Sequence, residues 1–287
     1  MSPQVKAFFD EETNTVTYVV TDGTSSSCAI IDPVLDLDMA AGRTSTASAD
    51  RVIEFIRAND LEVDWILETH AHADHLSAAA YLKSKTGGKT GTGRFITGVQ
   101  ATFKDIFKLG DDFIPNGEQF DRLLDDGEML ELGTTHIRVM HTPGHTPSCV
   151  TFVIGDAAFV GDTLFMPDYG TARADFPGGD AAELYRSIQR IFELPPETRL
   201  FLCHDYKAPG RDEFEWESTV REQRASNIHI HDGINERDYV EFRRQRDSEL
   251  GMPKLILPSI QVNIRAGEMP PPDESGTVFL KIPVNVV

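Results

Sequence analysis

The chain has 287 residues, 40% of them hydrophobic, so it can bury a sizeable core without disulfide or metal staples. Its 46 acidic and 27 basic residues give a formal net charge of −19, which argues against nucleic acid or an anionic membrane as a general partner. No apolar run approaches the roughly 20 residues that cross a bilayer, and the first residues lack the apolar segment of an export signal. We therefore expect a cytoplasmic globular enzyme.

The three cysteines are consistent with a reducing compartment. Cys28, Cys149 and Cys203 are odd in number, and each lies in or beside an apolar segment, where a reduced thiol behaves as a small hydrophobic residue. A catalytic cysteine is the alternative, but no base lies beside Cys28 or Cys149, and Cys203 is adjacent to His204 only in sequence. We expect all three to be unreactive.

The first part of the chain predicts layered α/β structure. Residues 15–20 and 28–31 are rich in β-forming residues and flank a turn-type cluster, which indicates a hairpin. Residues 34–46 show no periodicity and predict a long loop bordering a site. Apolar residues at helical spacing then predict a helix over 49–59, followed by a buried strand over 63–67.

A cluster of potential metal ligands follows this strand directly. His70, His72, Asp74 and His75 lie within six positions. Neutral imidazole and ionised carboxylate are the ligands that suit zinc and iron. A solvated polar loop is the plainer explanation, but the H-x-H-x-D-H spacing makes it improbable. The sequence therefore predicts a metal site on this loop.

The next segments continue the alternation of helices and strands. A helix is predicted over residues 77–84, and the glycine-rich run over 87–93 predicts a flexible turn, because it lacks the G-x-x-x-x-G-K-[ST] order of a phosphate loop. An amphipathic helix containing Val99 and Phe103 precedes a short strand over 136–140.

Three further strands end in ligand-type residues. His145 lies in a Pro-Gly turn after the strand over 136–140, Asp162 follows residues 157–161, and His204 follows residues 199–203. His136 and His141 are better explained as strand-end or surface residues. Four strands that end in this way predict ligands converging at one edge of a sheet sandwich.

In these motifs the chain resembles the metallo-β-lactamase superfamily over about residues 5–210. The resemblance implies an αββα sandwich with the metal site at the sheet edges. The superfamily contains hydrolases and oxidoreductases, and a complete ligand set does not distinguish a binuclear zinc site from a mononuclear iron site. The seven possible ligands are His70, His72, Asp74, His75, His145, Asp162 and His204.

Three segments, residues 161–166, 170–176 and 203–206, resemble the persulfide dioxygenase branch of this superfamily, especially its bacterial members that use glutathione persulfide. The resemblance implies a reaction of glutathione persulfide with O₂ and water that gives glutathione and sulfite. Two histidines and one carboxylate would leave coordination positions open for sulfur and O₂. The family pattern implies one Fe(II) per chain on His70, His145 and Asp162, with His72, Asp74, His75 and His204 around it but not ligating.

Basic residues near these motifs are candidate anchors for the glutathione carboxylates, because guanidinium and ammonium groups bind carboxylates. The Tyr206 hydroxyl is placed to reach the substrate or the reacting oxygen. Arg173 could equally form a structural ion pair with Asp175. The predicted substrate-binding residues are Arg173, Lys207, Arg211 and Arg265.

The rival enzyme is a binuclear-zinc thioesterase of the glyoxalase II type, which also recognises glutathione and uses a metal-bound hydroxide. A non-catalytic protein on the same fold would be expected to have lost ligands, and none is missing here.

The composition changes near residue 213, which predicts a boundary there. The part that resembles the superfamily would form a metallo-β-lactamase-like domain over 1–212, and residues 213–287 an appendage packed on the same domain. Helices are expected over 217–228 and 236–250, then an apolar run over 255–258 and a Pro-rich tail. This appendage could cover the pocket, form a homodimer contact or cap apolar surface. His229 and His231 are expected to be exposed in its linker.

Overall fold

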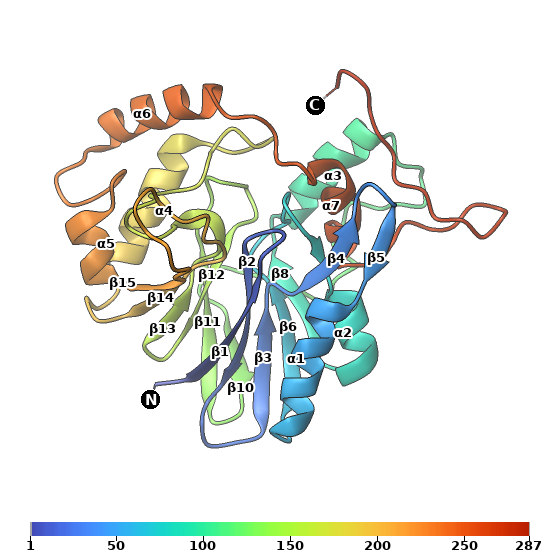
Figure 1. Cartoon of the computed structure of the whole chain (residues 1–287), viewed down its shortest axis with the longest axis horizontal. Coiled ribbons are helices and arrows are strands. Elements are labelled where there is room, and N and C mark those ends of the chain that lie inside the picture. The colour runs from blue at the N-terminus through green and yellow to red at the C-terminus, as the bar shows by residue number, and fades with distance from the viewer. Residues whose placement is uncertain (1, 287) are drawn as a thin grey trace.

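The computed structural model describes residues 2–286. Two six-stranded sheets pack face to face, and helices cover both outer faces, α1 and α2 on one side and α4, α5 and α6 on the other (Figure 1). The predicted αββα layering is confirmed. No helix among the described residues is long and apolar enough to cross a membrane.

The first sheet contains the predicted hairpin, which has a further antiparallel strand on one side and parallel strands on the other. The glycine run predicted as a flexible turn is a strand in this sheet, so that prediction was wrong. A Cβ at Gly93 would overlap the Ser148 carbonyl oxygen, so glycine is required there for the two sheets to approach. The strands, in spatial order, are β1 (Gln4–Asp10), β2 (Thr15–Thr21), β3 (Ser27–Ile31), β6 (Glu62–Glu68), β8 (Lys89–Gly93) and β9 (Arg122–Leu124).

The second sheet is an antiparallel meander extended by a parallel strand and a final antiparallel strand. Its last strand lies beyond residue 212 and pairs with β14, so the predicted domain boundary falls between two paired strands. In spatial order the strands are β10 (Met129–Leu132), β11 (Thr135–His141), β12 (Val150–Ile154), β13 (Ala157–Phe159), β14 (Arg199–Phe201) and β15 (Glu217–Thr219).

The segment predicted as a long loop over residues 34–46 instead contains most of a small third sheet. Strands β4 (Val34–Asp38) and β5 (Arg43–Ser45) form a hairpin, and β7 (Leu76–Ser77) pairs with β4. The ligand loop therefore begins at β6 of the first sheet and ends at β7 of the third sheet, so strand pairing holds both of its ends.

The helices form the outer layers. The predicted helix over 217–228 starts later than expected, because β15 occupies its first residues and a capping box of Thr219 and Glu222 begins α5. The helices are α1 (Ala47–Ala58), α2 (Ala79–Thr86), α3 (Ile96–Phe107), α4 (Ala181–Phe192), α5 (Val220–Ser226), α6 (Glu236–Ser248) and α7 (Ile256–Asn263).

Apolar side chains fill the space between the layers. Val16, Leu67, Phe152 and Phe159 belong to the core between the two large sheets. Separate clusters bury the inner faces of α1 and α2 against the first sheet and of α4 against the second. This packing fixes the strand ends from which the candidate ligands project.

Candidate metal centre

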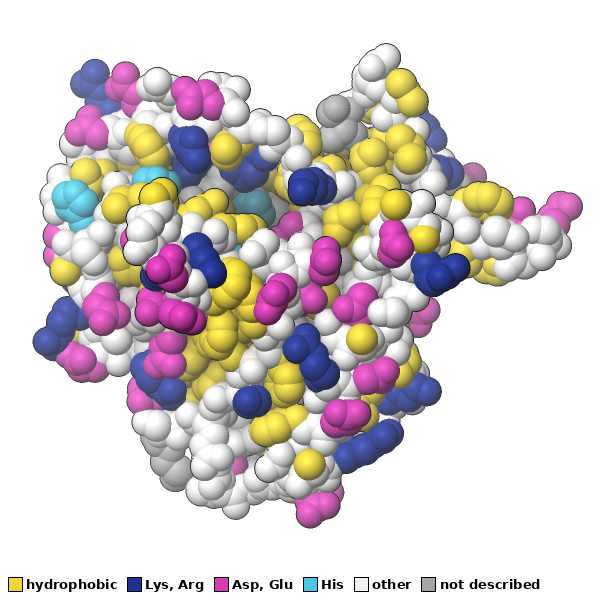
Figure 2. Space-filling view, in the orientation of Figure 1, with side chains coloured by type: hydrophobic (Ala, Val, Ile, Leu, Met, Phe, Trp, Pro, Cys, Tyr) yellow, Lys and Arg dark blue, Asp and Glu magenta, His cyan; other side chains and the backbone are white. Residues whose placement is uncertain are grey.

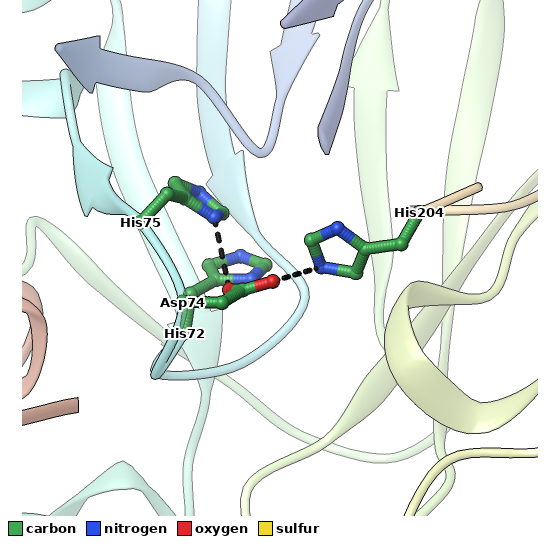
Figure 3. Close-up of side chains that lie close together, drawn as sticks. All are labelled: His72, Asp74, His75 and His204. Carbon is green, nitrogen blue, oxygen red and sulfur yellow. Dashed lines mark hydrogen bonds and ion pairs between the residues drawn. The ribbon is translucent and has the colours of Figure 1, made fainter. Parts of the chain in front are cut away.

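The seven possible ligands come together at one edge of the sandwich. Six of them are buried, and Asp74 is partly buried. They form two adjacent groups, each with ligand atoms close enough to share an ion. The first group contains His70, His145 and Asp162, and the second contains His72, Asp74, His75 and His204 (Figure 3).

The first group has the spacing of ligands around one ion. Asp162 Oδ2 lies 3.8 Å from His70 Nε2 and 3.6 Å from His145 Nε2. Bonds of about 2 Å from one metal to each donor span such distances. These contacts are too long for hydrogen bonds, so they do not by themselves satisfy the buried polar atoms.

Hydrogen bonds on the far side of each ring orient the first group. His145 Nδ1 donates to the Arg173 carbonyl oxygen at 2.8 Å, which leaves Nε2 with its lone pair toward Asp162. His70 Nδ1 lies 3.0 Å from Thr69 Oγ1, which itself donates to Asp32 at 2.9 Å. His70 therefore also directs Nε2 into the site, as a metal ligand requires.

Asp32 supports both groups, although no motif in the sequence pointed to it. Its Oδ1 accepts a hydrogen bond from the Thr69 backbone N–H at 2.7 Å and lies 3.0 Å from His72 Nε2. The Asp32 carboxylate raises the pKa of His72, although burial opposes the imidazolium form. Its position directly after strand β3 was a usable signal, because strand ends in this chain carry the site.

The second group comes from both sheets. Figure 3 shows His72, Asp74 and His75 on one loop, with His204 pointing toward them from the opposite sheet. His204 Nε2 lies 2.9 Å from Asp74 Oδ2 and 3.2 Å from Asp162 Oδ1, so Asp162 faces both groups. Asp74 and His204 are thus in direct contact.

Within residues 2–286, four buried imidazole nitrogens have no well-aligned hydrogen-bond partner. Buried polar atoms without partners are rare and costly in folded proteins, so these point to ligation. The donor set of imidazole nitrogen and carboxylate oxygen fits Fe(II) or Zn²⁺. The four atoms are His70 Nε2, His72 Nδ1, His75 Nε2 and His204 Nε2.

The protonation states in the first group also suit a metal. Burial lowers the pKa of His70 well below its usual value, so its imidazole is neutral. Burial alone would raise the pKa of Asp162, but His204, His70 and His145 hold it well below its usual range. A neutral imidazole and an ionised carboxylate are the forms that bind metal.

The three cysteines are buried free thiols, as predicted. Burial raises the pKa of Cys28 and Cys149 to about 12, so both remain protonated. Cys203 Sγ donates to Asp32 Oδ2 at 3.6 Å, which gives this thiol a supporting role next to the metal centre.

Asn263, at the end of α7, holds the ligand loop and was not identified from the sequence. Its Nδ2 donates to the carbonyl oxygens of His72 and His75, both at 2.8 Å, and its Oδ1 accepts from the Ser77 N–H at 2.7 Å. Asn263 is buried, so these bonds connect the C-terminal segment to the metal centre.

Asn263→Ala should destabilise the fold and weaken metal binding together. The variant leaves three backbone groups unpaired, at a cost of about 1–3 kcal/mol for each group that water does not reach. Thermal unfolding and metal titration of the purified protein measure the two effects. Asn59→Ala, at an exposed helix end, is the matched control, and equal behaviour of the two variants would show that Asn263 does not hold the loop.

A cavity of about 1330 Å³ opens beside the first group, and His145, Asp162 and Asp74 line it. Tyr206 also lines it, and its predicted catalytic role stays a prediction. Its hydroxyl donates to Asp74 Oδ2 at 3.4 Å, and its ring stacks on His204. Burial raises the pKa of Tyr206 well above its usual value, so the hydroxyl keeps its proton.

Of the four predicted substrate anchors, Arg173 lines the cavity, but its guanidinium is already engaged. It binds both oxygens of Asp175, at 2.5 and 2.7 Å, and donates to the Gly251 carbonyl oxygen at 2.7 Å. The ion-pair interpretation left open by the sequence is therefore the arrangement present. A role for Arg173 in binding substrate stays a prediction.

The other three predicted anchors do not line the cavity, because their side chains are engaged elsewhere. Lys207 Nζ lies 4.1 Å from the centre of the Phe214 ring. Arg211 pairs with Asp205 and Asp168 at 2.5–3.2 Å. The Arg265 guanidinium lies 4.4 Å from the centre of the Phe113 ring.

The prediction that His229 is exposed was wrong. Its ring is partly buried, lines the cavity and accepts a hydrogen bond from the Thr171 backbone N–H at 3.0 Å. Burial lowers the pKa of His229 to about 4, which keeps the ring neutral and able to accept. His231 is likewise partly buried rather than exposed.

A model of the metallo-beta-lactamase superfamily matches residues 10–204. A probable metallo-hydrolase of Burkholderia pseudomallei is 53% identical, with 99% of both chains covered. The beta-lactamase hydrolase-like protein of Agrobacterium fabrum is 51% identical, and the alignment covers 99% of this chain but only 65% of that longer protein. Glyoxylase B2 of Dictyostelium discoideum is 46% identical, with 98% of this chain and 97% of the relative covered.

More distant relatives carry a different name. Persulfide dioxygenase ETHE1 of Bos taurus is 29% identical, with 93% of this chain and 90% of the relative covered. The crystal structure of ETHE1 from Myxococcus xanthus superposes with a TM-score of 0.74 at 27% identity, covering 92% of this chain and all of that one.

Proposed function

The chain belongs to the metallo-β-lactamase superfamily, and from that premise we propose that it is an iron-dependent persulfide dioxygenase. The proposed reaction converts glutathione persulfide, O₂ and water into glutathione, sulfite and two protons. The likeness to ETHE1 in sequence and in fold supports this assignment.

The observation that carries the proposal is the spacing of His70, His145 and Asp162. Asp162 Oδ2 lies 3.8 Å from His70 Nε2 and 3.6 Å from His145 Nε2, whereas Asp74 Oδ2 and His204 Nε2 contact each other directly at 2.9 Å. The first group therefore leaves space for an ion between its ligand atoms, while in the second group Asp74 and His204 already contact each other. Bound there, Fe(II) would supply redox chemistry and open coordination positions for a persulfide sulfur and O₂, and the outer sulfur itself would give up the electrons that reduce O₂.

The chain's own residues then bind, orient and shield the reactants. The Arg173 carbonyl oxygen and Thr69 fix the two imidazoles, which keeps one face of the triad open to the cavity. Phe165 and Phe176 line the cavity beside the ligands and lower its polarity, which favours an apolar sulfur. Tyr206 holds a proton within reach of this space.

A binuclear-zinc hydrolase of glutathione thioesters is the second candidate. The second group, with Asp162 Oδ1 turned toward it, supports this alternative because it provides ligands for another ion. The 46% identity to a protein named Glyoxylase B2 supports it as well. In that case a metal-bound hydroxide would be the nucleophile.

Protein purified anaerobically should contain about one iron per chain and consume O₂ only when glutathione persulfide is supplied, because a triad of two histidines and one carboxylate suits Fe(II) oxygenation. Metal analysis and an oxygen electrode measure this, with S-lactoylglutathione as the comparison substrate. Two zinc ions per chain and thioester hydrolysis without O₂ uptake would contradict the dioxygenase assignment.

A further inference from the structure

The last described residues expose a row of apolar side chains. Residues 278–286, here called the C-terminal strip, form neither helix nor strand and run along the periphery of the molecule (Figure 1). Figure 2 shows hydrophobic side chains at the surface in the same region. Monomeric proteins rarely leave so many large apolar side chains in water side by side, so the strip is built to be covered. The side chains that are 41–74% exposed are Val278, Phe279, Ile282, Val284 and Val286.

Contacts with the body of the protein fix the strip in place. The Lys281 backbone N–H donates to Gln261 Oε1 at 2.8 Å, and Gln261 Nε2 donates to the Lys281 carbonyl oxygen at 3.0 Å. Gln261 lies on α7 and is buried. Leu280 packs against the apolar cluster that includes Val262 of the same helix. The strip is therefore a positioned surface, and its exposed side chains are presented in a defined arrangement.

The strip also presents a free backbone edge. The Gln261 amide bonds both the N–H and the C=O of Lys281, as a neighbouring strand would. In an extended chain the backbone groups of successive residues point to opposite sides, so those of Ile282 point away from α7. Within residues 2–286 no hydrogen bond reaches them. Pro283 lacks an N–H on the side that faces α7, so it leaves the free edge uninterrupted.

The charge of the strip differs from that of the rest of the chain. The chain has a net charge of −19, but residues 277–286 contain no acidic residue and a single lysine. The Lys281 ammonium group donates to the Lys108 carbonyl oxygen at 2.7 Å, so it lies against the body of the protein. Two acidic copies of this chain repel each other over most of their surfaces, whereas two strips meet without opposing carboxylates.

We propose that the strip is the contact between two copies of this chain, paired antiparallel across a two-fold axis beside Ile282. The strip suits self-pairing because its aliphatic residues alternate on both sides of Ile282. Ile282 then faces its own copy, and Leu280 faces Val284 of the partner subunit. Strand pairing occupies both free edges, and the aliphatic side chains cover one another. This interface is independent of the reaction that the metal centre performs.

The mass in solution tests the interface. Light scattering after size exclusion, over a series of concentrations, should give the wild type twice the 31.9 kDa of one chain. Ile282→Asp places like charges opposite each other at the axis, so its dimer should dissociate at about tenfold lower concentration or less readily form at all. Met129→Asp is the matched control, because Met129 is 53% exposed on β10. A monomeric wild type, or an Ile282→Asp variant that dimerises as the wild type does, would overturn the proposal.

A cysteine in the strip tests the register. The three natural cysteines are buried, so Ile282→Cys adds an exposed thiol to a chain whose own thiols are shielded. Opposite residues that exchange both backbone hydrogen bonds have Cα atoms about 5.5 Å apart, which a disulfide can span. Oxidised Ile282→Cys should therefore migrate as a covalent dimer. Val278→Cys should not, because Val278 is remote from its own copy. Absence of the covalent dimer in Ile282→Cys, or equal cross-linking of both variants, would reject this register.

Mixing two variants separates self-pairing from a folding defect. Ile282→Asp and Ile282→Lys should each be monomeric alone, because each places like charges at the axis. An equal mixture should form a dimer, since opposite charges then face each other. Recovery of the dimer would show that both variants are folded and that the strip contacts its own copy. A mixture that stays monomeric would overturn the two-fold pairing at Ile282.

Discussion

His145→Ala should remove the bound metal and abolish turnover, whereas His204→Ala should keep its iron with reduced activity. His145 directs Nε2 toward Asp162 in the first group, and its loss takes away one of three ligands. His204 is outside that triad and contacts Asp74 at 2.9 Å. Loss of a side chain that only supports a metal site typically lowers metal affinity or activity about 10- to 100-fold. The activity of His204→Ala should decrease by a factor in that range, and the activity of His145→Ala by a much larger factor.

Metal content per chain and O₂ uptake, measured on both variants and on wild type, provide the comparison. His136→Ala is the matched control, because His136 is an exposed histidine on β11, remote from the ligand groups. In a binuclear zinc enzyme His204 would hold the second ion, so its loss would empty that position. Equal metal loss in the two variants would therefore favour the thioesterase.

Arg243→Met should lower the free energy of unfolding more than any surface substitution on the same helix. Arg243 and Asp247 form a buried ion pair on α6, with Nε and Nη2 of the arginine 2.9 and 2.7 Å from Asp247 Oδ1. Removing one partner leaves the other charge buried and uncompensated, which costs about 3–5 kcal/mol. Urea unfolding measures the loss, with Arg244→Met as the exposed control on the same helix.

The same pair also supports the metal centre. Arg243 donates to the Thr171 carbonyl oxygen at 3.1 Å, and Asp247 accepts from the Ala174 N–H at 2.9 Å, so the pair holds the segment that carries Arg173. The double variant Arg243→Met with Asp247→Leu should recover much of the stability, since it buries no charge. It should still bind metal more weakly, because the carbonyl that orients His145 is less firmly held. Wild-type metal affinity in this double variant would show that the pair serves stability alone.

The resemblance to the superfamily predicted the αββα layers, and the pattern of strand ends predicted the convergence of the ligand residues. Ligand types such as His145 and Asp162 follow β-rich runs directly, and adjacent strand ends meet at one edge of a sheet. The supporting residues were harder to find. Asp32 and Asn263 form hydrogen bonds with groups 37 to 191 residues away in the chain. No local sequence pattern predicts such contacts.

The errors have related physical causes. The glycines of β8 suggested a turn, but at Gly93 the absent side chain serves close packing against the other sheet. Sequence proximity to His204 suggested Lys207 and Arg211 as anchors, which stays a prediction; in the structure Arg211 is bound by two carboxylates and Lys207 lies on an aromatic ring. Arg246 and Lys254, which do line the cavity, come from α6 and the segment after it, and only the tertiary structure brings them to the site.

The clamp formed by Asn263 has a consequence for the order in which the centre is built during synthesis. Asn263 follows His75 by 188 residues, so a growing chain contains every candidate ligand before the residue that immobilises their loop has been made. Until then the loop has its flanking strands β6 and β7 but lacks the three hydrogen bonds made by Asn263. The hydrogen bonding that fixes the ligand loop is therefore complete only after α7 has docked.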